Sequence, residues 1–349
     1  MHFRYVFFRD INLSDPFFDS LKADYAEFVD WFSRKANEKA YIFVDDNNYC
    51  QGFLYLKIED EEISDVTPTL QAKRRIKIGT LKINAHGTRM GERFIKKALD
   101  FAMYNSVDEV YVTIFSHHEG LVRIFNTYGF NYAAQKTTIN GTELVLLKSL
   151  RALNHTVKSS YPLVNANSRK FLLSLYPQWH SRLLPDSILH TEDPQEIITD
   201  VSYTNSINKI YLTAMRGTEH LQSGDLLLIY RTSDQPNNAY HRSVVTSVCV
   251  VDEVRNIADF PTIDDFLRYS LSYSIFSEFE LRQFYASRQY PVVIRFTYNF
   301  ALNRRVNRAY MIENLGLPPR AYTGFMEISD SLFMGVLEQG NSNEGFIVN

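Results

Sequence analysis

Cysteine is nearly absent from this chain of 349 residues, which contains only Cys50 and Cys249. Two cysteines so far apart lack the paired spacing of a zinc knuckle or a redox CxxC motif. The histidines also lack close ligand spacing, so we expect no metal site. A disulfide framework is excluded, and this cysteine usage favours a reducing, cytoplasmic compartment.

Long apolar runs and an excess of one charge are missing as well. No stretch approaches about 18 consecutive apolar residues, so we expect neither a membrane-spanning helix nor a membrane partner. Charges at Arg4, Arg9 and Asp10 interrupt the apolar segment that a signal peptide needs. Lys and Arg number 37 against 40 Asp and Glu, a net charge of −3. Attraction to nucleic acid by bulk positive charge is therefore excluded, whereas a local basic groove is not.

What the chain does contain is the composition of a globular protein, with 45% hydrophobic and 22% charged residues. The length favours two domains over one. A polar stretch over 151–170, rich in Asn and Ser, is typical of a connection between domains. We therefore expect one domain over 1–150 and a second over 171–349.

Periodicity in the first half alternates between strand and helix patterns. Aromatic residues at three- and four-residue spacing after Asp15-Pro16 indicate one or two amphipathic helices that end near Lys35. Another helix follows Gly91, and a short one covers 120–127. Strands are expected over 3–8, 41–44, 49–58, 75–84, 110–114, 132–134 and 144–147.

A strand that runs into a glycine-containing turn and then a helix is a general device for holding phosphate, because backbone N–H groups and the helix dipole both favour an anion. The other interpretation is an ordinary strand-to-helix connection. The candidate strand residues are Leu81, Lys82 and Ile83, and the candidate turn is His86, Gly87, Thr88, Arg89, Met90 and Gly91.

The order of elements over residues 1–150 resembles the GNAT superfamily of acyl-CoA-dependent N-acyltransferases. His86 stands where that family has Arg or Gln, and Arg89 replaces its middle glycine. The resemblance implies a mixed, mostly antiparallel sheet with helices on both faces. It also implies that the turn from His86 to Gly91 holds the pyrophosphate of acetyl-CoA. The backbone of Leu81 to Ile83 would then pair with the pantetheine arm.

Catalysis by this family requires a base for the incoming amine and an acid for the leaving thiolate. The position that the resemblance gives to a tyrosine acid holds Phe125, which has no proton to donate. Our catalytic candidates are His117, His118 and Tyr128. The alternatives are solvated histidines, a packing tyrosine, and catalysis by positioning with water as the proton acceptor.

The second half contains many expected strands and few helices, a pattern that favours a small mixed β-barrel. The turn Ser223-Gly224-Asp225 before an apolar strand, with a Val-rich strand at 247–251, resembles the PUA-like superfamily, including ASCH and EVE domains. The resemblance implies binding of RNA or modified bases. Expected strands cover 171–175, 209–212, 226–230, 244–254, 292–298 and 332–337, and expected helices cover 260–269 and 278–286.

Basic and aromatic residues come together near the end of the second half. Arginine binds phosphate and tyrosine stacks on unpaired bases, so this combination is a candidate nucleic-acid site. A solvated loop is the other interpretation. The candidate residues are Arg304, Arg305, Arg308 and Tyr310.

The fold class predicted from the sequence is therefore α+β, a GNAT fold followed by a PUA-like mixed β-barrel. The predicted activity is acetyl-CoA-dependent N-acetylation of an amine on RNA, either a base or aminoacyl-tRNA. A toxin with an antitoxin partner is one form of this hypothesis. The alternatives are acetylation of a protein or small amine, and a non-catalytic sensor of acyl-CoA or a modified base.

Overall fold

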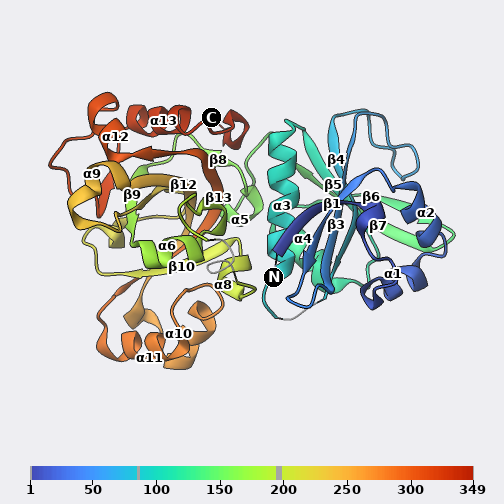
Figure 1. Ribbon diagram of the computed structural model, residues 1–349, viewed down its shortest axis with the longest axis horizontal. Coiled ribbons are helices and arrows are strands. Elements are labelled where there is room, and N and C mark those ends of the chain that lie inside the picture. Colours follow the sequence, from blue (N-terminus) through green and yellow to red (C-terminus); the bar gives the residue numbers. More distant parts are fainter. Residues whose placement is uncertain (1, 85–86, 194–198, 349) are drawn as a thin grey trace. The chain divides into compact units, whose positions relative to one another are not determined.

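The computed structural model describes residues 2–84, 87–193 and 199–348 of the chain (Figure 1). The chain divides into two compact units, Met1–Ala152 and Leu153–Asn349. Within the stretch expected to connect the domains, α5 (Val157–Ser160) and β8 (Val164–Asn165) are elements of the second unit.

The first unit contains a seven-stranded sheet in the order β1-β2-β3-β4-β5-β7-β6. Neighbouring strands are antiparallel except β4 and β5, which are parallel. The expected mixed, mostly antiparallel arrangement is present. The strands are β1 (His2–Phe7), β2 (Lys39–Val44), β3 (Cys50–Glu59), β4 (Arg75–Ile83), β5 (Glu109–Ile114), β6 (Asn131–Thr138) and β7 (Gly141–Ser149).

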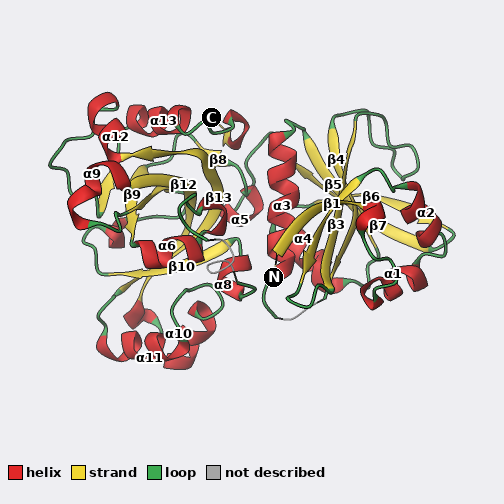
Figure 2. Ribbon diagram, in the orientation of Figure 1, coloured by secondary structure: helices red, strands yellow, loops and turns green. Residues whose placement is uncertain are grey.

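Helices cover both faces of this sheet, as Figure 2 shows. Side chains alternate between the two faces along a strand, so the contacts of two neighbouring residues of β3 show which helices cover each face. Phe53 packs against Phe18 of η2 and Phe32 of α2. A side chain at Gly52 would instead collide with Phe94 of α3. The helical elements are η1 (Phe8–Asp10), η2 (Pro16–Phe18), α1 (Asp19–Asp24), α2 (Phe28–Arg34), α3 (Met90–Tyr104) and α4 (Glu119–Thr127).

The second unit contains a six-stranded mixed sheet in the order β10-β13-β12-β11-β9-β14 and a two-stranded pair, β15-β8. Only β9–β11 is parallel in the larger sheet. Its strands are β9 (Lys170–Leu175), β10 (Asn208–Thr213), β11 (Leu226–Arg231), β12 (Val244–Asn256), β13 (Val292–Asn307) and β14 (Phe325–Glu327), and the pair is completed by β15 (Ile347–Val348). The α+β class is confirmed.

The described part of the second unit is not a closed barrel, because β10 and β14 remain as edges that do not pair with each other. One reason lies near the C-terminus, where the strand expected over 332–337 is wrong. That stretch belongs to α13 (Asp330–Gln339), whose N-terminus is capped by Ser329. Its buried Leu332, Phe333 and Val336 recur at helical spacing, so the apolar run covers a face instead of extending the sheet.

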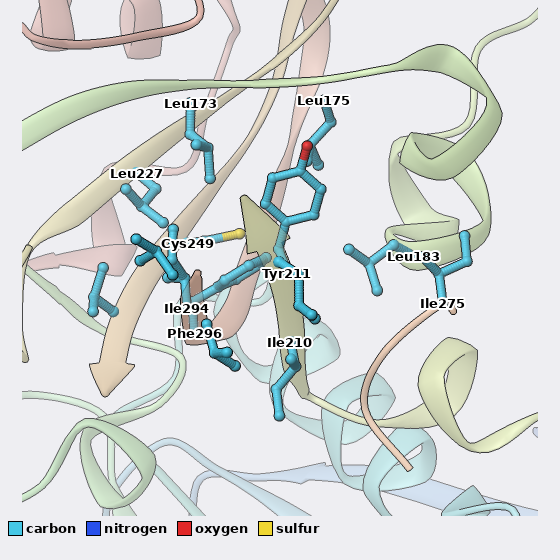
Figure 3. Packing of buried hydrophobic residues seen from close by; sticks show 14 of the residues in the cluster. Leu173, Leu175, Leu183, Ile210, Tyr211, Leu227, Cys249, Ile275, Ile294 and Phe296 are labelled. Atoms are coloured by element: carbon cyan, nitrogen blue, oxygen red, sulfur yellow. The ribbon is translucent and has the colours of Figure 1, made fainter. Parts of the chain in front are cut away.

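The core of the second unit forms where the six strands of the larger sheet meet helical segments, and Figure 3 shows part of it. Leu173, Leu227 and Cys249 lie close to Ile294 and Phe296 in this cluster, all of them buried. The two helices expected near 260–269 and 278–286 are present as α10 (Ile263–Ser270) and α11 (Glu278–Ser287). The remaining helices are α6 (Pro177–Leu183), α8 (Ser202–Asn205), α9 (Ala239–Arg242) and α12 (Arg308–Asn314), with 3-10 turns η3 (Pro185–Ser187), η4 (Thr218–His220), η5 (Pro236–Asn238), η6 (Ile257–Asp259) and η7 (Glu344–Phe346).

No helix within the described ranges is both long enough and apolar enough to cross a membrane.

Candidate active site

The parallel strands β4 and β5 pair over only part of their length. Their pairing runs from Arg75 opposite Glu109 to Ile78 opposite Val112 and stops there, while β4 continues to Ile83. On its other edge β4 pairs with β3 as far as Ile83. Backbone groups of β4 beyond Ile78 therefore face the β5 side without a strand partner among the described residues, and an extended ligand chain can bond to them.

A bulge at Gly79 marks the point where β4 leaves β5. Thr80 pairs with Tyr55 and Ile78 pairs with Leu56, so Gly79 is the extra residue. A Cβ atom at Gly79 would lie 2.7 Å from Cδ1 of Tyr55, so only glycine fits beneath that ring. The bulge bends β4 and opens the edge described above.

The candidate phosphate turn connects β4 to the N-terminus of α3. His86 lies outside the described residues. Gly87 is exposed with φ of +76°, and Arg89, with φ of +58°, precedes the first residue of the helix. No described atom comes within 4 Å of a Cβ built on Gly87. An exposed glycine backbone beside the start of a 15-residue helix is suited to an anion such as a phosphate group.

The other residues of the predicted donor site are placed as follows. Leu81, Lys82 and Ile83 form the half-buried end of β4, and Thr88 is half-buried in the turn. Met90 is buried as the first residue of α3.

Gly91 has a packing role that the sequence did not reveal. A Cβ atom at this position would lie 3.1 Å from Cδ1 of Ile124 in α4. The glycine therefore allows α4 to approach α3 closely, whether or not a ligand binds at the turn.

Tyr128 lies at the end of α4 and is 2% exposed. Its hydroxyl donates to Oε2 of Glu92 in the first turn of α3, at 2.8 Å. Arg89 donates from Nη1 to the other carboxylate oxygen, also at 2.8 Å. These contacts indicate that Tyr128 holds the turn in place, and its catalytic role stays a prediction. Phe125 is fully buried and packs against Phe130.

His117 and His118 follow β5 directly and form an aromatic group with Phe115. The rings of Phe115 and His117 stack at 5.4 Å between centroids, and those of His117 and His118 are 4.2 Å apart. Burial lowers the pKa of His118, and the neighbouring His117 lowers it further. His118 is therefore neutral near pH 7 and able to accept a proton.

Tyr25 and Glu143 complete this group, although sequence reasoning did not single them out. The Tyr25 hydroxyl donates to Oε1 of Glu143 at 3.0 Å, and the Tyr25 ring stacks on Phe115 at 5.7 Å. Burial, followed by the charge of Glu143, raises the pKa of Tyr25. Glu143 is only 6% exposed. One signal was available: Glu143 alternates in phase with Val145 and Leu147, which identifies a carboxylate on an apolar strand face.

The segment η2–α1 and the residues just after α1 lie beside the ends of both separated strands. Lys82 of β4 donates from Nζ to the Ser20 hydroxyl and lies over the Phe17 ring at 5.0 Å. Burial lowers the pKa of Lys82. At the end of β5, Phe115 contacts Tyr25. The open edge of β4 and the histidines after β5 are thereby brought together at one end of the sheet.

The predicted nucleic-acid residues belong to β13 and α12 of the second unit. Arg304 is exposed on β13, and Tyr310 is half-buried on α12. Arg305 donates to the carbonyls of Leu302 and, at 3.1 Å, Ile188. Arg308 donates to the carbonyl of Pro319 at 3.0 Å. Arg305 and Arg308 therefore brace neighbouring loops, and their role toward nucleic acid stays a prediction.

No group of three or more His, Cys, Asp or Glu side chains within the described ranges is placed to hold a metal ion.

Among the comparisons with known proteins, only the search of solved structures finds similar proteins. No protein-family profile matches the sequence, and no curated protein matches it. The chain is similar to an acetyltransferase of the GNAT family from Streptococcus agalactiae, with 13% identity over 42% of this chain and 94% of that one, at a TM-score of 0.33. It is also similar to the NatC complex bound to a Gag peptide and CoA, with 17% identity over 42% and 98% and a TM-score of 0.30. The chain is similar as well to a mutant of the ZmASCH protein from Zymomonas mobilis. The two share 10% identity over 50% of this chain and 97% of that one, at a TM-score of 0.31. Similarity at this level assigns neither an activity nor a substrate.

Proposed function

We propose that the first unit is an acyl-CoA-dependent N-acyltransferase. One observation carries the proposal: the bulged strand β4 has an open backbone edge that leads directly to the N-terminus of α3. An edge of this kind suits the amides of a pantetheine arm, and the helix start suits a pyrophosphate. Few other ligands combine an extended amide chain with a phosphate group at its end.

The residues of the donor side would act by binding and orientation. Backbone groups from Gly79 to Ile83 would hold the pantetheine arm in extended form. The N–H groups of Gly87 to Gly91 would bind the pyrophosphate, with His86 as a further member predicted from the sequence. Acyl-CoA supplies an acyl group activated as a thioester.

The acceptor side would bind an amine and remove its proton. The amine nitrogen forms a bond to the acyl carbon, the carbon–sulfur bond breaks, and the proton leaves toward Nδ1 or Nε2 of His118. Because Phe125 has no proton to donate, water protonates the departing thiolate in this scheme. The Glu143 carboxylate, held by Tyr25, favours a cationic acceptor nearby.

The acceptor itself has two candidate classes. Asp24 and Glu27 flank Tyr25, and with Glu143 they make this region acidic, which favours a cationic amine on a protein or small molecule. An amine on RNA and a toxin with an antitoxin partner stay predictions from the sequence. Their support is the resemblance of the second half to PUA-like domains and the position of Arg304 on an exposed part of β13.

Two substitutions at Gly87 test the donor site, because Asn and Asp both tolerate positive φ. Gly87→Asp places a negative charge at the phosphate turn, and we expect acetyl-CoA binding at least 10-fold weaker by calorimetry. Gly87→Asn has nearly the same shape without the charge, and its affinity should stay within about threefold of the wild type. If acetyl-CoA at millimolar concentration leaves the melting temperature of the wild type unchanged, or if both variants bind it equally, the proposal is wrong.

A further inference from the structure

A groove of about 510 Å³ lies on the second unit, and none of its lining residues is among those predicted from the sequence to have a function. It is bordered by the end of β12, the segment after η6 and the helix α10. Its lining residues are Arg255, Phe260, Pro261, Asp265, Arg268 and Tyr269. This volume and the mixture of apolar walls with a few charged groups are typical of small-molecule sites.

The central feature of the groove is Arg255, whose guanidinium lies over two aromatic rings. Its Cζ atom is 4.1 Å from the centroid of the Phe260 ring and 5.4 Å from that of Tyr269. In the described part of the chain Arg255 forms no ion pair. A guanidinium held over aromatic rings can still donate its N–H groups to an anion.

The nearest carboxylate on the same strand, Glu253, is already engaged. Its Oε2 accepts from the Tyr269 hydroxyl at 2.9 Å and pairs with Arg295 at 2.9 Å. Arg295 also bonds to Asp252 at 2.7 Å. Neither of these two carboxylates forms an ion pair with Arg255.

A second guanidinium lies at the rim. Arg268 is 77% exposed and pairs with Asp265 through one contact of 3.1 Å. An exposed pair of this kind contributes little and exchanges readily for a better anion. Two arginines against one aspartate leave the lining with a net positive charge.

The walls of the groove are held in place before any ligand arrives. The Tyr285 hydroxyl donates to the carbonyl of Phe260 at 2.9 Å. Thr262 caps α10 by accepting from the backbone N–H of Asp265 at 3.1 Å. A preformed site loses less conformational entropy on binding.

We propose that this groove binds a small phosphate monoester that carries a flat ring. The forked N–H groups of Arg255 and Arg268 would share the phosphate oxygens. A phosphate dianion suits two guanidinium groups better than a carboxylate does. The ring would lie against Pro261, on the apolar side of the groove. This site is independent of the proposed acyltransferase activity, and its test needs no acyl donor.

Phenyl phosphate is the probe, titrated into the full-length protein by calorimetry. We expect Arg255→Gln to weaken binding at least 10-fold, whereas Arg282→Gln, on the exposed side of α11, should change it less than twofold. Inorganic phosphate should bind at least 10-fold more weakly than phenyl phosphate. The proposal is overturned if the wild type does not bind phenyl phosphate at about 10 mM, if Arg255→Gln binds as well as the wild type, or if inorganic phosphate binds equally well.

A gain of affinity separates this proposal from simple misfolding. Asp265→Asn removes the carboxylate that competes for Arg268 and keeps nearly the same shape. We expect it to tighten phenyl phosphate binding about threefold or more, a result that an unfolded variant cannot give. Unchanged or weaker binding by Asp265→Asn would show that Arg268 does not bind the phosphate.

Discussion

The two adjacent histidines after β5 differ in their environment, and under the proposed function this difference would give them different roles. His118 occupies the position before the first residue of α4 without a side-chain capping bond, and burial together with the proximity of His117 lowers its pKa. His117 stacks on Phe115 at 5.4 Å. A histidine whose pKa lies below its ordinary value near 6.5 is unprotonated at neutral pH, as a base must be.

The first prediction at this scale concerns the pH dependence of acyl transfer, and it rests on the proposed function. Because protonated His118 cannot act as a base, the rate should fall as the pH drops below about 6.5 and should be level above about 7. His118→Gln should lower the rate about 100-fold or more. The measurement is release of the CoA thiol from acetyl-CoA in the presence of a panel of primary amines.

His117→Gln is the matched control for this prediction. It leaves the base in place, so the maximal rate should stay within about threefold. It also removes a group that lowers the pKa of His118. The decrease in the rate of acyl transfer at low pH should therefore begin at a higher pH than in the wild type. Full activity of His118→Gln would remove His118 from the mechanism.

At the scale of elements, the N-terminus of α3 is tied to the end of α4. Tyr128 donates to Glu92, and Gly91 lets Ile124 approach. The contact matters because α3 begins where the candidate phosphate turn ends. A hydrogen bond between buried groups at this point holds the start of α3 against the end of α4.

The substitution Tyr128→Phe tests this contact between α3 and α4. It removes the hydroxyl that satisfies a buried carboxylate oxygen, and we expect the free energy of unfolding to fall by about 1–3 kcal/mol in urea titrations. Tyr132→Phe, in the exposed strand β6, should cost less than about 0.5 kcal/mol. Loss of acyl transfer by Tyr128→Phe with unchanged stability would instead identify Tyr128 as the missing acid.

At the scale of the whole molecule, charge is nearly balanced throughout the chain. Lys and Arg number 19 against 20 Asp and Glu in residues 1–150, and 18 against 20 in the rest. Arg305 and Arg308, two of the predicted RNA-binding residues, are engaged with backbone carbonyls. Net charge therefore provides no attraction to a nucleic acid in either half of the chain.

We accordingly expect no retardation of a random-sequence DNA duplex by micromolar protein at about 150 mM salt. Gel-shift titrations from 50 to 200 mM salt provide the measurement. Binding that weakens steeply with salt over this range would contradict the prediction and would restore a basic nucleic-acid surface as a working hypothesis.

Local sequence patterns determined most of the first unit. The helix stripes, the strands expected over 132–134 and 144–147, and the succession of strand β4 and helix α3 all depend on residues close together in the chain, and each is present. Periodicity failed at 332–337, where an apolar run of six residues suits either a buried strand or a helix face. The choice depended on the Ser329 cap and on packing beneath α13, which a short window does not contain.

Cysteine scarcity and balanced charge, by themselves, determined what this protein is not: neither a disulfide scaffold nor a binder of nucleic acid by bulk charge. Only the tertiary structure decided where chemistry can occur. Tyr25 and Glu143 are 118 positions apart and meet through one hydrogen bond. The open edge of β4 exists because β5 stops pairing at Val112. Arg255 stands out because its guanidinium lies over two aromatic rings and forms no ion pair in the described part of the chain. The first two of these features depend on contacts between segments far apart in the sequence, and no local pattern encodes them.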